Sequence, residues 1–478
     1  MLFHSFTYFI FLPFVVITYH LLPARFRWIL LLAASYYFYM CWKPIYATLI
    51  LFSTSIDFFT GLKMDACEKK SDKKPWLMLS LISNLLLLFV YKYTDFFSTS
   101  FNQLFQVVHL PFQFPVPHWL LPVGISFYTF QSLSYTIDVY RGNQKAEPHF
   151  GKFALFVSFF PQLVAGPIER STDLMPQIHG DRNTNPERIA RGVRLILWGF
   201  FKKLVVADRL SPFVDSVYNN MGAHSGLTIL MATYAFAFQI YGDFSGYSDI
   251  AKGSAQLLGI DLMENFKTPY FSTSIVDYWR RWHVSLSTWF RDYVYYPLGG
   301  NKQGPKIWAR NILIVFIISG LWHGAAWVFV FWGVYHGVLL LTTHFFSKLV
   351  EKYYPGFNSL KETLSFKLMS IVVTFHLVCF GWVFFRSSSL GQIRLFLSRL
   401  SQMNWTFQFD SNFSKSDCLV AIAALLAWVL VEATQQKKMP LSWMQLPKVF
   451  RWSFLYVLFF SIIVLGVIGA KPFIYFQF

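Results

Sequence analysis

The sequence has only four cysteines, and their spacing forms no recognisable motif. Cys41, Cys67, Cys379 and Cys418 are dispersed, without a CxxC pair or a mixed Cys/His spacing. We therefore expect neither a disulfide framework nor a metal site. The sequence also has no glycine-rich phosphate loop and no GxSxG motif, so it gives no support to an ATP-driven or serine-nucleophile mechanism.

Charged residues are scarce as well. They make up 14% of the chain, whereas hydrophobic residues make up 55% and aromatic residues 20%. An ordinary soluble domain carries about 25% charged residues and fewer aromatic ones. This composition excludes an ordinary soluble domain and predicts a polytopic membrane protein.

Apolar stretches long enough to span a bilayer lie at residues 6–22, 28–42, 45–61, 76–93, 118–138, 190–208, 227–258, 311–346, 366–385, 417–433 and 451–470. The stretch 227–258 is too long for one span, and 311–346 is long enough for two. We expect an all-α fold of about eleven or twelve transmembrane helices, with re-entrant and interfacial helices in addition. Within this single membrane domain, residues 1–140 are interpreted as N-terminal helices, 141–346 as the core with the candidate site, and 347–478 as C-terminal helices.

Basic residues exceed acidic ones by 41 to 24, which gives a net charge of +17. In a membrane protein, such an excess is typical of cytoplasmic loops and of contact with anionic lipid. The clearest cytoplasmic loop runs from Lys63 to Lys74. Because three apolar stretches precede it, we expect the N-terminus outside and Arg25 and Arg27 inside. The basic residues form no separate soluble domain, so a nucleic-acid partner is not expected.

Two segments before residue 200 interrupt the apolar pattern. Pro122–Tyr135 carries hydroxyl groups and an amide through an apolar stretch, which leaves helix packing and a substrate path both open. Phe159–Arg170 is short, apolar and broken by proline and glycine. Such a backbone is tolerated at membrane depth only when it is buried in protein or lines a cavity, so we predict a re-entrant segment.

Two carboxylates interrupt the stretch 227–258. On a continuous helix Asp243 and Asp249 would lie about 120° apart, so they form no obvious acid–base pair. We predict that they cap a broken helix and pair with Arg or His.

Tryptophan and tyrosine are mixed with arginine in the segment 277–293. This pattern predicts an amphipathic segment at the membrane interface, with its rings towards lipid and Arg280 and Arg281 towards phosphate groups. The basic cluster continues to Arg310 and leads into the next apolar stretch, where a cytosolic anion can be gathered. From its own segment alone, His283 is interpreted as a surface-layer histidine bonded to a neighbour.

His323 lies inside the long apolar stretch 311–346, where ionisable side chains are rare and usually mark a pathway or a reaction site. A helix that begins after Arg310 would place His323 about 20 Å along its axis, beyond the midpoint of a core about 30 Å thick. A reaction site and a neutral histidine bonded to a neighbouring helix both remain open. Gly320 and Gly324 permit close backbone approach or a kink. His336, His344 and His376 are interpreted as structural.

Several motifs together resemble the membrane-bound O-acyltransferases, and most closely their bacterial alginate O-acetyltransferase branch. The resemblance is carried by Asp243–Asp249, Trp279–Ser287 and Leu321–Ala325, and it extends to Pro122–Gly142 and Pro472–Phe478. It covers nearly the whole chain.

The resemblance implies that His323 is the catalytic histidine and His283 a second signature polar residue. It further implies a funnel-like bundle in a bacterial inner membrane, with cytosolic acetyl-CoA as donor, a polysaccharide acceptor outside and a periplasmic or extracellular partner protein. No bound cofactor is expected. The candidate donor-binding residues are Arg280, Arg281, Trp322, Trp327, Asp243 and Asp249.

Two mechanisms and two other functions stay open. Neutral His323 can act as a general base in direct acyl transfer, or it can carry the acyl group itself. A related branch transfers D-alanine from a carrier protein to teichoic acid. A proton-coupled transporter is the alternative from another class; it would show inverted repeats and intramembrane charge pairs, and neither is visible in the sequence.

Overall fold

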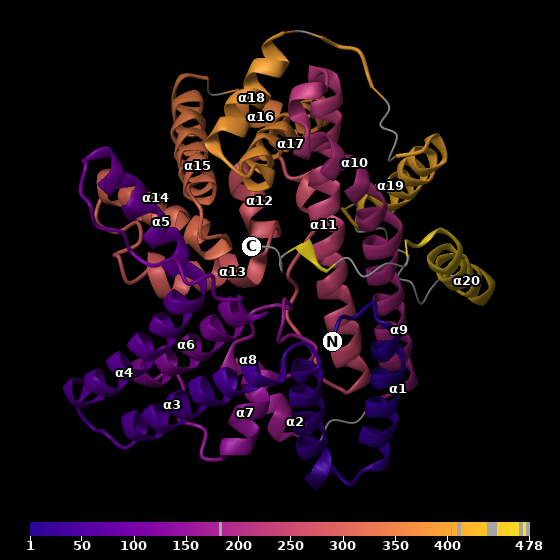
Figure 1. Ribbon diagram of the computed structural model, residues 1–478. Coiled ribbons are helices and arrows are strands. Elements are labelled where there is room, and N and C mark those ends of the chain that lie inside the picture. Colours follow the sequence, from indigo (N-terminus) through magenta and orange to yellow (C-terminus); the bar gives the residue numbers. More distant parts are fainter. Residues whose placement is uncertain are drawn as a thin grey trace. The chain divides into compact units, whose positions relative to one another are not determined.

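The structure is a computed structural model that describes residues 1–478 except 181–183, 355, 403, 409–412, 437–446, 468–471 and 475–478. The end of the motif Pro472–Phe478 therefore lies outside the described residues. The described residues form helices joined by turns and irregular segments (Figure 1). They fall into two compact units, one of Met1–Ile196 and Ile250–Met263, the other of Leu197–Asp249 and Glu264–Phe478.

The first unit contains the N-terminal helices. They are α1 (Phe6–Leu21), α2 (Ala24–Met40), α3 (Ala47–Asp65), α4 (Lys70–Leu88), α5 (Thr94–Val107), α6 (Ile125–Arg141), α7 (Phe150–Ser158) and α8 (Ser171–His179). Helix α9 (Pro186–Phe200) begins in this unit and ends in the second, and α11 (Gly226–Leu257) begins in the second and ends in the first.

The second unit contains the remaining helices. They are α10 (Asp208–Asn219), α12 (Ile275–Arg281), α13 (Val284–Phe290), α14 (Pro305–His323), α15 (Trp327–Tyr353), α16 (Phe357–Glu362), α17 (Leu364–Arg386), α18 (Leu390–Ser401), α19 (Lys415–Gln436) and α20 (Lys448–Leu465). Short π-helical stretches occur at Phe201–Ala207 and Arg291–Tyr295.

The all-α polytopic architecture is confirmed. Among the described residues, seven helical segments are long and apolar enough to cross a membrane, fewer than the eleven or twelve expected. Three of the expected spans form helices at or just below the short end of the range that crosses a bilayer, about 17–25 residues: α1 has 16 residues, and α2 and α6 have 17 each. The stretch 227–258 forms one continuous helix rather than a broken one.

Hydrogen bonds hold α3, α4 and α6 together within the first unit, where the three helices lie side by side (Figure 1). Asp57 of α3 accepts from Ser80 Oγ at 2.6 Å and from Asn84 Nδ2 at 2.8 Å, both on α4. Ser80 also bonds to Thr136 Oγ1 of α6 at 3.1 Å. The hydroxyl groups of Ser80 and Thr136 therefore serve helix packing.

The segment Phe159–Arg170 is irregular and almost fully buried, as predicted for backbone of this kind. Gly124, which begins α6 with φ +79°, lies so close that an added Cβ would be 2.8 Å from the carbonyl oxygen of Leu163. Met263 N–H donates to Glu169 Oε1 at 2.7 Å. The segment is thus held inside the first unit by backbone contact and hydrogen bonding.

Aromatic side chains form much of the core of the second unit. Trp282 and Trp382 pack with ring centroids 5.0 Å apart, and the indole of Trp382 donates to Tyr270 Oη at 3.1 Å. Trp282 and Trp289 are 1% and 5% exposed. These rings of the segment 277–293 were expected to face lipid, but both are buried in protein; Trp282 packs against Tyr241 of α11 and Trp382 of α17.

Candidate functional site

The two signature histidines lie close together in the second unit, although they are forty residues apart in sequence. His323 is the last residue of α14, and His283 lies in the turn between α12 and α13. Their ring centroids are 6.3 Å apart. Each ring nitrogen lies less than one bond length from the centre of its ring. Even the nearest nitrogens of the two rings are therefore farther apart than the donor–acceptor distance of a direct hydrogen bond, about 2.7–3.2 Å. A reacting group between the rings would be within reach of both.

The position of His323 is set by close contact between two backbones. Helices α14 and α15 form an antiparallel hairpin joined by Gly324–Ala326. A Cβ added at Gly320 would lie 2.2 Å from Phe329 O, and one added at Gly333 would lie 2.2 Å from Phe316 O. The predicted close approach at Gly320 is confirmed. The helices approach each other so closely only because these positions carry no side chain.

Aromatic rings surround the imidazole of His323, which is 4% exposed. The rings of Trp322 and Trp332 lie 5.0 Å from it, and the ring of Phe385 on α17 lies 5.4 Å from it. The helix that carries His323 begins at Pro305, six residues before the expected start. His323 therefore lies about 27 Å along the helix axis rather than about 20 Å, and it is the last residue of the helix.

His283 is buried, so its interpretation as a surface-layer histidine was wrong. It is 1% exposed, and the ring of Phe244 lies 4.7 Å away with its plane nearly perpendicular. Its backbone has φ +44°, an uncommon conformation for a residue with a Cβ, often found where function fixes the geometry. The residues that bury it come from α11 and from the loop before α12, and their proximity is not visible in the local sequence.

Asn265 fixes the tautomer of His283. Its Oδ1 lies 3.1 Å from His283 Nδ1 and also accepts from Ser285 N at 3.3 Å and Ser285 Oγ at 2.9 Å. Since an amide oxygen only accepts, the proton of neutral His283 resides on Nδ1 and the lone pair on Nε2. Burial lowers the pKa of His283 from 6.5 to about 3, so its ring is neutral near pH 7.

The structure brings Trp322 to the site and leaves Trp327 and the arginines at the surface. The Trp322 ring lies 5.8 Å from that of His283 and 5.0 Å from that of His323. Trp327 is 52% exposed; Trp332, not Trp327, packs against His323. Arg280 is exposed, and Arg281 is half-buried and bonds to Asp277 at 2.8 Å.

Asp243 and Asp249 do not cap a broken helix, because α11 is continuous through both of them. They pair with lysines rather than with Arg or His. Lys202 Nζ lies 2.6 Å from Asp249 and 2.8 Å from Ser245 Oγ. Lys203 bonds to Asp243, and its Nζ lies 2.9 Å from Asp208.

These contacts form a buried lysine–aspartate network, which the sequence did not show. Asp243 and Asp249 lie forty or more positions from their lysines, so these two pairings were not readable from the sequence, whereas Asp208 lies only five positions after Lys203. The signal that was available is the Lys202–Lys203 pair inside the apolar stretch 190–208.

His336 was interpreted as structural, yet it lies next to the site. It is 2% exposed, and its ring lies 5.1 Å from that of Trp279 and 4.9 Å from that of Trp332. His336 Nδ1 and the indole nitrogens of both tryptophans are buried without a hydrogen-bond partner among the described residues. Burying polar atoms in this way costs free energy, so this part of the core is not optimised for stability alone.

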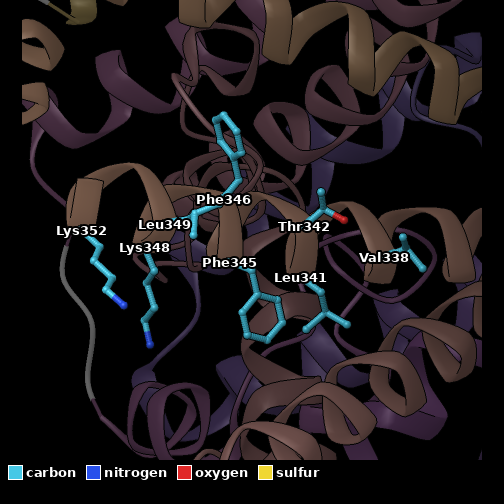
Figure 2. A pocket seen from close by; sticks show the side chains of 8 residues that line it. All are labelled: Val338, Leu341, Thr342, Phe345, Phe346, Lys348, Leu349 and Lys352. Carbon is cyan, nitrogen blue, oxygen red and sulfur yellow. The ribbon is translucent and has the colours of Figure 1, made fainter. Parts of the chain in front are cut away.

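A groove on α15 is a different feature. Its volume is about 680 Å³, and Figure 2 shows the side chains that line it: Val338, Leu341, Thr342, Phe345, Phe346, Lys348, Leu349 and Lys352. The lining is mostly apolar and exposed, as expected of a membrane-spanning helix that faces lipid, and neither site histidine contributes to it. Within the described residues, no cluster of three metal-ligating side chains occurs.

Comparison with known proteins agrees with the geometry. Residues 85–385 match the membrane-bound O-acyltransferase family. Both site histidines, His336 and the lysine–aspartate network lie within the matched residues. The match also covers the whole of α14 and α15 and all of α17 except Arg386; these helices supply rings that surround His323.

Three relatives show how far the similarity extends. The chain is 38% identical over 425 residues to the "Probable alginate O-acetylase" of Azotobacter vinelandii, which covers 88% of this chain and 82% of that protein. It is 37% identical over 413 residues to the "Peptidoglycan O-acetyltransferase" of Helicobacter pylori, covering 80% and 76%. The "Teichoic acid D-alanyltransferase" of Bacillus subtilis is 31% identical over 280 residues, covering 56% of this chain and 70% of that relative.

Proposed function

The chain belongs to the membrane-bound O-acyltransferase family, and from that premise we propose that it transfers an acetyl group to a hydroxyl of an extracellular polysaccharide, with His323 as the general base. As a member of this family it is an acyltransferase in the membrane. The observation that carries the proposal is the pairing of two buried histidines whose ring centroids are 6.3 Å apart.

The chemistry needs a neutral base next to a hydroxyl and a thioester. His323 takes the hydroxyl proton while the oxygen attacks the thioester carbonyl carbon. The new C–O bond forms, the C–S bond breaks, and the imidazolium returns its proton to the leaving thiolate. The lone pair on His283 Nε2 accepts a hydrogen bond from a second, neighbouring hydroxyl of the acceptor sugar and so orients the attacking one. The rival mechanism, an acyl-histidine on His323, uses the same residue as nucleophile.

Acetyl-CoA is the proposed donor, with the exposed Arg280 as a first contact for its phosphates. We place the protein in a bacterial inner membrane with the N-terminus outside, because the lysine-rich loop from Lys63 to Lys74 follows three apolar stretches. The segments 94–117 and 387–416, exported on this topology, are too small to bind a long glycan. A periplasmic or extracellular partner therefore completes the transfer; full-rate acetylation of polysaccharide by the purified chain alone would contradict this.

D-alanyl transfer to teichoic acid is the second candidate, supported by the 31% identity to a D-alanyltransferase. The comparison favours acetyl transfer, because identity and coverage are both higher for the acetyl-transferring relatives. The transporter alternative gains buried charge pairs from the structure, but family membership argues for chemistry at His323 instead.

The test measures ester-linked acetate on the host's extracellular polysaccharides. We compare wild type, a deletion, and the deletion complemented with His323→Ala or His344→Ala at equal membrane abundance. His344→Ala is the matched control, since this half-buried histidine lies on α15 outside the site. Acetate lost on deletion, restored by His344→Ala and not by His323→Ala would support the proposal. Acetate unchanged in the deletion would overturn it, and D-alanine esters would be measured next.

A further inference from the structure

The first unit contains a polar cavity to which nothing above gives a role. Its volume is about 310 Å³, and it lies where α2 begins, with residues of α7 and α8 along its wall. The lining includes Arg25, Arg27, Trp28, Lys152 and His179. Three cations thus meet in one small cavity, whereas the lining of the α15 groove is mostly apolar.

A hydrogen-bonded chain holds Lys152 in place. Lys152 Nζ lies 2.9 Å from His179 Nδ1, and His179 Nε2 lies 2.7 Å from Glu147 Oε2. Because an ammonium group only donates, His179 Nδ1 accepts and its Nε2–H donates to the carboxylate. Glu147 is 7% exposed and is separated from Lys152 by the imidazole. Lys152 therefore keeps its charge towards the cavity and has two further N–H donors.

The start of α2 adds to the positive potential. Arg25 is exposed; its guanidinium lies 4.8 Å from the ring of Phe26, and no acidic side chain among the described residues pairs with it. Pro23, the residue before α2, offers no side-chain hydrogen bond to the first turn. The first N–H groups of a helix carry partial positive charge, which favours an anion at this end.

We propose that this cavity binds a phosphate group. Arginine and lysine form strong charge-assisted hydrogen bonds with phosphate oxygens, and a cavity of this size admits a phosphorylated headgroup. The phosphate belongs either to an anionic phospholipid or to a soluble nucleotide. Leu21 and Phe26, 79% and 41% exposed beside the cavity, would contact acyl chains in the first case. The indole of Trp28 provides a stacking surface for a base in the second.

The experiment measures binding to the full-length chain in detergent by native mass spectrometry. The probes are dioleoyl phosphatidylglycerol and adenosine 3′,5′-bisphosphate. The test variant is Arg25→Gln/Lys152→Gln. The matched control, Lys69→Gln/Lys74→Gln, removes the same charge from two exposed lysines at the start of α4. Binding is measured without acyl transfer, so the result does not depend on the function proposed above.

We expect the test variant to raise the Kd of at least one probe about tenfold, with the control unchanged. The probe that responds identifies the source of the phosphate. Lys152→Arg should retain binding, because it keeps the charge. If the double variant unfolds at a lower temperature than wild type, the exposed Arg25→Gln alone is compared instead. Failure of the wild type to bind either probe, or equal Kd values in test and control variants, would overturn the proposal.

Discussion

Two clusters in the second unit bury polar side chains, and they offset the free-energy cost of that burial in different ways. In the lysine–aspartate network, Lys202 and Lys203 compensate three carboxylates with opposite charge. In the histidine pair, His283 and His323 lie among aromatic rings. Charged groups that are held in ion pairs are poorly suited to proton transfer, because each charge is stabilised by its partner. A neutral base surrounded by apolar side chains can accept a proton. On the function proposed above, the lysine–aspartate network is structural, and the histidine pair is the cluster that acts on the proton.

The largest effect on stability is expected from a substitution that breaks the lysine–aspartate network. Lys203→Met leaves Asp243 and Asp208 buried without their cation, which should destabilise the protein by about 3–5 kcal/mol. The thermal unfolding midpoint in detergent measures this. Lys348→Met, at an exposed lysine on α15, is the control, and adding Asp243→Asn to Lys203→Met should recover part of the loss. An unchanged midpoint would show that the network contributes no stability.

The second prediction concerns pH. Unfolded His283 binds a proton with a pKa near 6.5, whereas the folded protein binds it only near pH 3. Below pH 6.5 the unfolded state therefore binds more protons, and stability falls by about 1.4 kcal/mol per pH unit. His283→Gln should remove this contribution. Unfolding midpoints of both proteins between pH 8 and pH 5 test it, and parallel curves would contradict the buried, neutral assignment.

The third prediction tests the tautomer. Asn265→Asp keeps the acceptor for His283 Nδ1 and adds a negative charge, which raises the pKa of His283 and should move the acid limb of the activity profile to higher pH. Asn265→Ala removes the acceptor and should cost about 1–3 kcal/mol of stability. Asn102→Asp adds the same charge at a partly buried amide of the first unit. If it moved the profile equally, Asn265 would have no positioning role.

The smallest effect distinguishes two tryptophans. Trp332 packs against His323, whereas Trp327 is 52% exposed. Trp332→Phe should lower the rate severalfold, a loss of about 1 kcal/mol, through a looser wall around the imidazole. Trp327→Phe should leave the rate unchanged. The measurement is the acyl-transfer rate of each variant at equal membrane abundance. A greater loss of rate with Trp327→Phe than with Trp332→Phe would show that Trp327 belongs to the site.

Sequence identified the residues whose signal is local. His323 is recognisable as an ionisable side chain in an apolar stretch with Gly320 and Gly324 on either side, and composition alone predicts the all-α membrane fold. His283 carries no such signal, because its burial depends on Phe244 and its tautomer on Asn265, both distant in the chain.

The other missed features also depend on distant segments. Lys203 becomes part of a network only when α11 brings Asp243 to it. His336 lies one helical turn from Trp332 on α15, which is readable from the sequence, but only tertiary packing places it against Trp279 of α12. Contacts between side chains on different helices are set by tertiary packing, and a local sequence pattern carries no information about that packing.

The glycines of the α14–α15 hairpin have a consequence for how such a sequence can diverge. Because main-chain atoms, rather than interlocking side chains, set the spacing at Gly320 and Gly333, the apolar residues around them can be exchanged for others of similar size with little displacement of His323. The glycines themselves admit no replacement, since even a methyl group would meet a carbonyl oxygen. Substitutions should therefore accumulate freely along the lipid-facing sides of both helices while these two positions stay fixed.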